Sequence, residues 1–506
     1  MNLRPVCISA ILMALVLTVV NCGRDTVAPA IDTFSIPQLV FFNLTGNDEV
    51  VLFEGTASDG TRVSEVSVAI NGTAFSTAAI VPAGGAQTVD WTYMATAAEL
   101  PAGANTVLVR AVDSSDNETV SSPIIVQSTM GSTIDSLLAV LSVPRLADTI
   151  GLSTGSGQAF GNSATSWTIP IDAGLTLSGA GSATILEADI SHPVLFSVSA
   201  NLNLKNMVVR GAQVGVEVSD PSADPEILIE NCLFDGQGAW AIDAVDDEGT
   251  NVQFLSSTVD ASAASSASRG GLYLEGVTYY LVADSVFTGH TDPGGPADGT
   301  VEGAAVQVVG SSGQITESIF DGNALAIWAS GGSPLITSCD VLGATATTSY
   351  GINLTGGGGT ATVRRNTVDG HSGYGVRIGG EMTPVFYRNV ITLNKESGVL
   401  VDFTGTLQNA GEIVLGDNDK KSTTGFNDIF DNVYPGITGK IEVYVTEATP
   451  NDSKPYPVYP IKAHNNYWGA TVQDFVNART YDNFDTVPND RLALQPTFFT
   501  NSRNND

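Results

Sequence analysis

From residue 206 to residue 468 the hydrophobic and polar positions of the chain recur as one short phrase, repeated ten times. Each copy opens with an Asn or Ser, continues with an apolar pair and ends in a Gly, Asp or Asn turn. The opening residues are 20 to 39 residues apart: Asn206, Asn231, Ser257, Ser285, Ser318, Ser338, Asn366, Asn389, Asn427 and Asn466. A repeat of about 20 to 50 residues is typical of folds that stack one unit on the next and confine insertions to loops. The pattern therefore predicts a solenoid.

A second apolar pattern lies in phase with the first. After most copies comes a small residue, an apolar residue, a variable residue and another apolar residue, as in G-V-E-V from Gly215 and A-I-W-A from Ala326. Alternation with a period of two predicts a β-strand whose apolar residues point inward and whose variable residue points outward. We assign the small residue to a sharp corner, and Ile319 and Ile327 to the core. Two strands, a turn and a variable third side predict one coil of a parallel β-helix.

The end of the repeat region carries a more specific signal. The phrases F-N-D-I-F-D-N from Phe426 and A-H-N-N-Y-W-G-A from Ala463 resemble a terminal signature of bacterial surface β-helix proteins. The repeats resemble the right-handed parallel β-helix family with the pectate-lyase-type fold, over roughly residues 135 to 500. This resemblance implies the fold and leaves the activity open, because relatives include lyases, hydrolases, epimerases and proteins without known catalysis. The Asn and Ser of the corners are expected to form hydrogen-bonded ladders rather than a catalytic site.

Residues 30–128 follow a different pattern. Alternating segments at 50–55, 63–71 and 107–112 are separated by turn clusters such as Ser58-Asp59-Gly60. About seven short strands in about 100 residues predict a β-sandwich with Trp91 in its core. The phrase A-V-D-S-S-D-N from Ala111 resembles the late-strand turn of bacterial immunoglobulin-like domains, which usually hold another domain away from a membrane.

Residues 129–150 contain the best helix candidate, at 134–141. A helix at this place would cover the open N-terminal edge of the solenoid. The predicted fold class is therefore all-β: a right-handed parallel β-helix with an N-terminal cap at 129–506, preceded by a small immunoglobulin-like β-sandwich at 30–128.

The first residues resemble the signal of a bacterial lipoprotein. Arg4 precedes an apolar run at 6–20, which is too short to span a bilayer comfortably, and Val19-Val20-Asn21-Cys22 resembles a lipobox. The resemblance implies a signal peptide at 1–21, a lipidated Cys22 and a linker at 22–29; a short uncleaved anchor is the alternative. Gly23 favours the outer membrane. We expect a lipoprotein of the cell envelope, in the outer membrane or at the cell surface, that contacts the membrane through its lipid only.

Charge and cysteine content narrow the choice of partners. The 53 Asp and Glu against 21 Lys and Arg give a net charge of −32 without a basic stripe, so nucleic acid is not expected as a partner. The acidity is compatible with calcium binding but does not require it. Cys232 and Cys339 are four rungs apart, roughly 19 Å at the spacing of β-strands, which excludes a disulfide between them.

Two rows of outward positions contain the candidates for catalytic or metal-binding chemistry. The row on the second strand contains Glu217, Asp243, Tyr273, Gln307, Trp328, Asn353, Arg377 and Leu400, and the row before the repeat phrase contains Lys205, Glu230, Ser256, Asp284, Glu317, Thr337, Arg365 and Arg388. Glu217 and Asp243, with Asp246 and Asp247 in the next loop, form the best acidic cluster. No basic residue accompanies them on adjacent rungs, and His290, His371 and His464 follow no repeated spacing. We therefore assign no catalytic residue, no metal site and no cofactor.

Aromatic residues give the better functional signal. Trp240, Tyr350 and Tyr374 stand just before the second strand, while Tyr273 and Trp328 point outward from it. Aromatic rings on a long rigid face suit stacking on sugar rings, and covering of neighbouring turns is the simpler alternative. The first hypothesis is a surface lipoprotein that binds a glycan or another surface partner without catalysis. The second is a tethered polysaccharide lyase or glycoside hydrolase, and the third is a structural surface protein.

Overall fold

The computed structural model describes residues 25–43, 49–131, 134–142, 149–154, 160–161, 167–220, 224–245, 249–262, 270–290, 304–343, 349–403, 413–416, 427–432, 443–447, 461–466, 480–482 and 494–498. The predicted signal peptide, Cys22, Asp246 and Asp247 lie outside these residues. The chain divides into two compact units, 1–132 with 149–156, and 133–148 with 157–506. Among the described residues, no helix combines the length and apolar composition needed to cross a bilayer.

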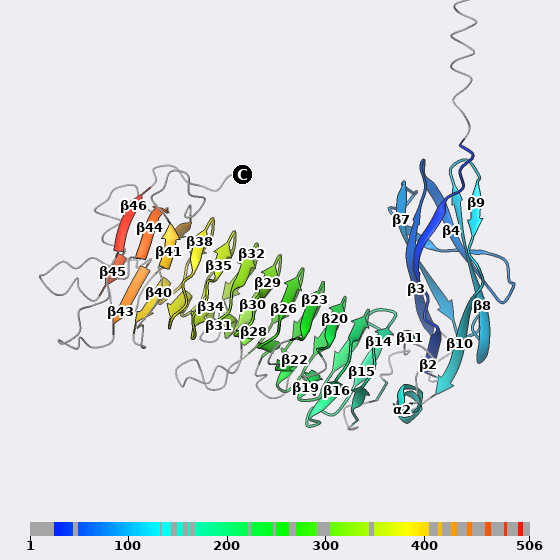
Figure 1. The fold of residues 1–506 in the computed structure, drawn as a ribbon, viewed down its shortest axis with the longest axis horizontal. Coiled ribbons are helices and arrows are strands. Elements are labelled where there is room, and N and C mark those ends of the chain that lie inside the picture. The colour runs from blue at the N-terminus through cyan, green and yellow to red at the C-terminus, as the bar shows by residue number, and fades with distance from the viewer. Residues whose placement is uncertain are drawn as a thin grey trace, which may run out of the picture. The chain divides into compact units, whose positions relative to one another are not determined.

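The first unit is a sandwich of two β-sheets (Figure 1). The first sheet of the sandwich is antiparallel and contains, in spatial order, β1 (Ala30–Ser35), β3 (Val50–Ser58), β7 (Thr88–Thr96) and β6 (Ala79–Val81). The second contains, in spatial order, β5 (Ser76–Thr77), β4 (Val63–Ile70), β8 (Gly103–Asp113), β10 (Ile124–Gly131), β2 (Leu39–Asn43) and β11 (Thr149–Leu152), with β9 (Glu118–Val120) also beside β8. The predicted domain boundary at 128 falls inside β10.

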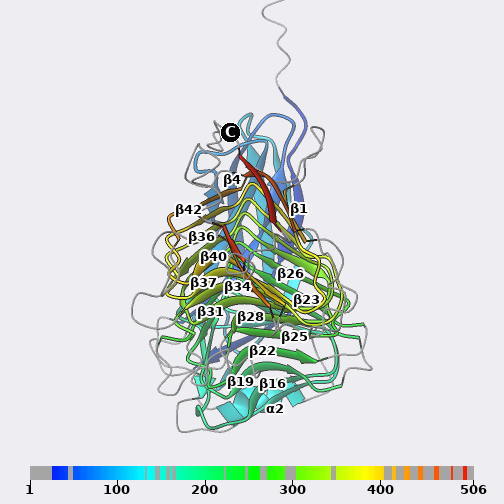
Figure 2. The same ribbon diagram turned by 90° about the vertical axis from the view of Figure 1, so that its left-hand side faces the viewer.

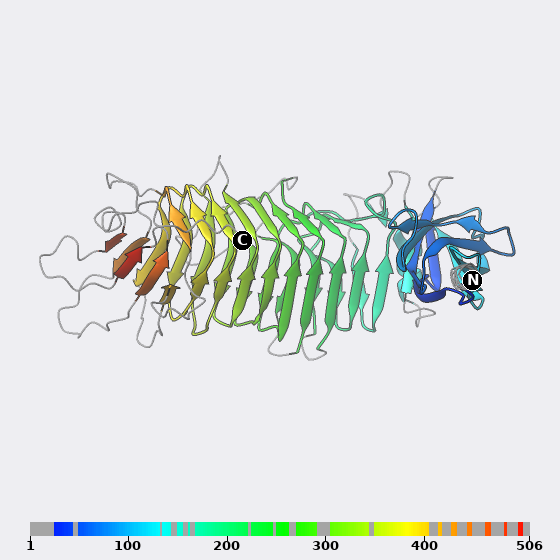
Figure 3. The same ribbon diagram turned by 90° about the horizontal axis from the view of Figure 1, so that it is seen from above.

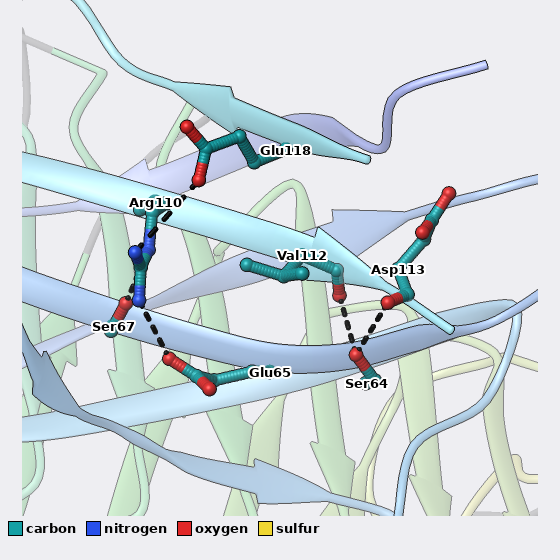
Figure 4. Close-up of polar contacts among 7 residues, drawn as sticks. All are labelled: Ser64, Glu65, Ser67, Arg110, Val112, Asp113 and Glu118. Atoms are coloured by element: carbon teal, nitrogen blue, oxygen red, sulfur yellow. Dashed lines mark hydrogen bonds and ion pairs between the residues drawn. The ribbon is translucent and has the colours of Figure 1, made fainter. Parts of the chain in front are cut away.

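Alternating side chains explain how the two sheets of the sandwich pack. On β8, Val107, Val109 and Ala111 are fully buried, and Trp91 on β7 is 1% exposed, so its assignment to the core is confirmed. Arg110 points to the other side of β8 and bonds Glu65 on β4 at 3.0 Å (Figure 4). A partly exposed ion pair of this kind stabilises by about 1 kcal/mol or less, so the buried apolar face holds the unit together.

The second unit is built from three parallel sheets that enclose one core, and successive strands of each sheet pair in parallel register. Figure 2, which looks along the stack, shows the sheets on different sides of the coil, and Figure 3 shows their parallel strands from above. The three sheets form the predicted parallel β-helix.

The sheet that precedes the repeat phrase, here called the first sheet, contains β14 (Leu175–Ser178), β17 (Leu202–Lys205), β20 (Glu226–Glu230), β23 (Asn251–Leu255), β26 (Tyr279–Ala283), β29 (Gly313–Thr316), β32 (Pro334–Thr337), β35 (Thr362–Arg364), β38 (Val385–Tyr387), β41 (Ile413–Gly416), β44 (Ile461–Asn466) and β46 (Leu494–Phe498). This side was expected to be variable loop. It is a strand in every described rung because segments such as E-I-L-I-E at 226–230 alternate with a period of two.

The second sheet holds the apolar residues of the repeat phrase. Its strands are β12 (Phe160–Gly161), β15 (Ile185–Glu187), β18 (Val208–Arg210), β21 (Leu233–Asp235), β24 (Thr258–Asp260), β27 (Val286–Thr288), β30 (Ile319–Asn323), β33 (Asp340–Gly343), β36 (Thr367–Asp369), β39 (Val390–Thr392) and β42 (Asp428–Phe430). The apolar pair is split between core and surface: Phe320 is fully buried and Ile319 is 42% exposed. The assignment of Ile319 to the core is therefore wrong, because consecutive residues of a strand face opposite sides.

The third sheet corresponds to the predicted second strand. It contains β13 (Ile169–Ile171), β16 (Val194–Val198), β19 (Val214–Val218), β22 (Trp240–Val245), β25 (Leu272–Glu275), β28 (Ala304–Val309), β31 (Leu325–Ser330), β34 (Tyr350–Thr355), β37 (Tyr374–Gly379), β40 (Ser397–Phe403), β43 (Val443–Glu447) and β45 (Thr480–Asp482). Ile327 on β31 is fully buried, as predicted. The small residue near the start of these strands does not lie at a corner, contrary to the prediction. A Cβ on Gly215 would lie 2.6 Å from the carbonyl oxygen of Ala241 and 2.9 Å from the ring of Phe234, so close packing requires the glycine.

The helix α2 (Ile134–Ser142) confirms the predicted helix. It belongs to the solenoid unit and contacts β13, the first strand of the third sheet, with Leu137 fully buried. The helix therefore packs where the solenoid begins, as a cap is expected to do.

The corner between the first and second sheets carries the predicted polar ladder, with a shift of one residue in some rungs. Ser257, Ser285 and Ser318 and then Asn366, Asn389, Asn427 and Asn466 form the ladder, and each of these side chains accepts or donates hydrogen bonds between rungs. Asn206, Asn231 and Ser338 do not belong to it. They occupy the preceding position, where φ is 55°, 52° and 58°. Asn is favoured both in this left-handed conformation and in ladders, so the residue type alone misassigned it.

The same shift overturns part of the predicted row before the repeat phrase. Lys205 pairs with Glu230, but Glu230 pairs with Leu255 rather than with Ser256. The other residues of this row that lie in the corner have positive φ and form no strand row: Ser256, Asp284, Glu317, Arg365 and Arg388.

The two described cysteines occupy ladder positions. Cys232 and Cys339 lie four rungs apart, both are buried free thiols, and burial raises the pKa of each to about 12.

Candidate ligand-binding face

One row of side chains crosses the outer face of the third sheet, and its predicted register is confirmed. The strand pairings place Glu217, Asp243, Tyr273, Gln307, Trp328, Asn353, Arg377 and Leu400 on successive rungs. We call these residues the outer row. Their neighbours along the strands, such as Val306 and Val308, point inward and are fully buried. Adjacent members are therefore about 4.8 Å apart along the solenoid.

The N-terminal end of the outer row is acidic. Glu217 and Asp243 pair directly across β19 and β22, and the electrostatic effect of Glu275 also reaches Asp243. Burial, then Glu217 and then Glu275 raise the pKa of Asp243 to about 6. In the described part of the chain, Glu217 and Asp243 form no ion pair. Sequence reasoning missed Glu275, although its position two residues after Tyr273 places it on the same face of β25.

Aromatic side chains follow the acidic end. The rings of Trp240 and Tyr273 pack at a centroid distance of 5.3 Å and a tilt of 32°, and the Tyr273 hydroxyl donates to Glu275. Trp328, two rungs further on, donates from Nε1 to Thr355 Oγ1 at 2.8 Å. All three rings are partly exposed. They lie where the sequence predicted a sugar-stacking surface.

A second aromatic pair lies beyond Trp328. The rings of Tyr350 and Tyr374 are 4.4 Å apart with a tilt of 34°. Tyr350 is partly exposed, but Tyr374 is only 4% exposed. Tyr374 therefore packs against Tyr350 from the next rung and does not itself offer a stacking face. Sequence position alone could not separate the two, because both stand at the start of a strand in the third sheet.

Two amides alternate with the aromatic residues of the outer row. Gln307 lies between Tyr273 and Trp328, and Asn353 follows Trp328. Gln307 is 6% exposed and Asn353 2% exposed, although both point away from the core. Gln307 Oε1, Asn353 Oδ1 and also Asp243 Oδ1 are enclosed without a hydrogen-bond partner. Each such acceptor costs about 1 to 3 kcal/mol unless a ligand or water donates to it.

The arrangement bears on the two catalytic chemistries considered from sequence, those of a polysaccharide lyase and of a glycoside hydrolase. Arg377 is the basic member of the outer row, but it is held by Asp402 at 2.5 Å and lies five rungs from Asp243, about 24 Å. That distance is too long for the acid and base of a polysaccharide lyase. Asp243 and Glu217 are adjacent, with one carboxyl that protonates more easily than usual, as a glycoside hydrolase requires.

The described histidines of the solenoid do not belong to the outer row. His290 and His371 are fully buried, and burial lowers the pKa of each to about 4. His464 lies on β44, and its side chain is outside the described part of the structure.

Among the described residues, one group of three carboxylates could hold a cation. These are Asp25, Asp59 and Asp113 of the sandwich, whose oxygens lie within 4.8 Å of one another. Thr61 donates to Asp25 and Asp59, and Asn117 donates to Asp113.

Comparison with known proteins agrees with the fold. Residues 250–426 match the family model described as the right handed beta helix region. No curated protein matches the chain. The matched segment contains the outer row from Tyr273 to Leu400; Glu217, Asp243 and the ring of Trp240 precede it.

Proposed function

We propose that this protein is a surface lipoprotein whose outer row binds a glycan chain that runs along the solenoid. The observation that carries the proposal is the alternation of partly exposed aromatic rings with enclosed acceptors that have no hydrogen-bond partner, at the rung spacing. Rings stack on the apolar faces of sugars, and the acceptors receive hydrogen bonds from hydroxyl groups. Tyr273 and Trp328 are two rungs apart, about 10 Å, so one extended chain can contact both.

The N-terminal segment supports the location. The lipobox-like phrase that ends at Cys22 predicts an anchor in the outer membrane or at the cell surface, and the sandwich at 30–128, proposed as immunoglobulin-like, would hold the solenoid away from the membrane. Cys22→Ala should release the protein from membranes, as measured by fractionation of cells. Unchanged membrane partition of this variant would refute the anchor.

The binding proposal is tested with the purified ectodomain on a glycan panel that records both retention and product release. Replacing Tyr273 and Trp328 together by Ala should weaken retention about tenfold or more, since each aromatic contact contributes about 1 kcal/mol. The matched control is Tyr279→Ala, which removes an exposed ring from the first sheet. An equal loss of glycan retention in the double variant and in Tyr279→Ala would contradict a binding site on the outer row. Retention that is unchanged in the double variant would contradict it as well.

A second function, glycoside hydrolysis, is favoured by one specific observation. The raised pKa of Asp243 beside Glu217 suits a general acid next to an ionised carboxylate. Hydrolysis predicts release of reducing sugar ends from a panel glycan, with loss of release in both Glu217→Gln and Asp243→Asn. Retention without product release would leave binding as the function.

A further inference from the structure

We propose that the acidic end of the outer row, at Asp243, Tyr273 and Gln307, is a subsite for a protonated amine, so that the glycan bound there is a polymer of amino sugars with free amino groups. The inference rests on the proposed glycan-binding function and specifies the chemistry of the ligand.

The first argument is charge. Glu217, Asp243 and Glu275 gather at this end, and in the described part of the solenoid the arginine and lysine side chains that form ion pairs do so elsewhere, with Glu230, Asp235 and Asp402. The nearest cationic member of the outer row is Arg377, about 24 Å from Asp243. A polyuronate would add further negative charge to this cluster, whereas an ammonium group would neutralise it.

The second argument is hydrogen bonding. Asp243 and Gln307 lie one rung on either side of Tyr273, and each presents an enclosed oxygen without a partner. Gln307 is 6% exposed, so its Oε1 is screened from bulk water. An ammonium group has three donors and no acceptor, which suits a place where only acceptors are unmet.

The third argument is the aromatic pair. Trp240 and Tyr273 pack beside these carboxylates at a centroid distance of 5.3 Å. Aromatic rings attract cations through their electron-rich faces, and an aromatic pair next to a carboxylate is the combination by which proteins recognise ammonium groups. The stacking surface and the negative charge therefore favour the same ligand at the same rungs.

The experiment measures binding of three oligosaccharide probes of equal length to the purified ectodomain at about pH 7, roughly one unit above the pKa of Asp243, where most of this carboxyl is ionised. The probes are a glucosamine oligomer, its fully N-acetylated form and a galacturonate oligomer, with polylysine as a measure of non-specific attraction to an acidic protein. The glucosamine oligomer should bind about tenfold or more tightly than the acetylated one, since loss of one good ammonium contact costs about 1.4 kcal/mol.

Asp243→Asn should remove this preference, because the amide keeps the shape and loses the charge. The matched control is Glu230→Gln, which removes the same charge from the same rung but from the first sheet, where Glu230 pairs with Lys205. The control should keep the preference. Equal binding of the free and acetylated oligomers, or equal losses in both variants and with polylysine, would overturn the amine subsite.

The two proposals fail separately. If the acetylated oligomer binds as well as the free amine and the loss of Tyr273 and Trp328 abolishes both, the glycan face stands and the amine subsite is wrong. If no oligomer binds, or binding is indifferent to the two aromatic residues, the proposed glycan-binding function is wrong.

Discussion

The corner ladder and the outer row both contain buried polar side chains that repeat along the rungs, but they differ in how far their hydrogen-bonding groups are satisfied within the chain. In the ladder, Asn366, Asn389 and Asn427 are buried, and each accepts from one rung and donates to the next. In the outer row, Gln307 and Asn353 are nearly as well buried, but an acceptor of each is left without a partner. The comparison indicates that the ladder serves the fold and that the outer row is arranged for something outside the chain.

The corner ladder and the outer row also differ in charge. The Asn and Ser residues of the ladder are neutral amides and hydroxyls, so their burial does not remove a charged group from water. The outer row buries Asp243 near two other carboxylates, which raises its pKa to about 6. Perturbed titration of this kind is common at functional sites, because a fold that needed stability alone would avoid it.

The largest expected effect tests the register that separates the core from the surface. Ile327→Asp places an unpaired charge in the fully buried interior and should lower the free energy of unfolding by about 5 kcal/mol or more, measured by denaturant titration. Ile319→Asp is the matched control, because this side chain is largely exposed and its change should cost less than about 1 kcal/mol. Similar losses in the two variants would show that the assignment of inward and outward positions is wrong.

The second effect compares the two rows directly. Asn389→Ala removes the acceptor for the backbone N–H and the side-chain amide of Asn366, and the donor to Val363 O, so the free energy of unfolding should fall by about 3 kcal/mol. Asn353→Ala, a chemically identical change in the outer row, removes an unpaired acceptor and should cost less than about 1 kcal/mol. If both variants lose the same stability, the outer row is as much a part of the fold as the ladder.

The smallest effect concerns Asp243 and depends on pH. The pKa is higher in the folded chain, about 6, than the ordinary 3.8, so folding favours the protonated carboxyl. Its contribution to stability is intact below about pH 4 and is lost as the pH rises through about 6. Asp243→Asn should therefore raise the unfolding free energy at pH 7 by about 1 kcal/mol, after solvent screening of this partly exposed group, and leave it unchanged at pH 4. Thermal melts at the two pH values measure the difference, and a pH-independent shift would contradict the assigned cause.

Much of the architecture follows from local pattern. Strand alternation has a period of two, so the outward positions from Glu217 to Leu400 could be aligned correctly from the sequence alone. The helix at 134–142 and the core position of Trp91 were predictable for the same reason, because both depend on the spacing of apolar residues. The corner residues were not, since Asn suits both the ladder and the left-handed turn beside it.

The sequence by itself therefore determined the stack of rungs and the identity of the residues that face outward on each of them. Only the tertiary structure decided what those residues experience. It buried Tyr374 beside Tyr350, enclosed the oxygens of Gln307 and Asn353, and brought Glu275 close enough to Asp243 to shift its pKa. Burial and electrostatic coupling arise from neighbours 20 to 40 residues away in the chain, which no local pattern of polar and apolar positions encodes.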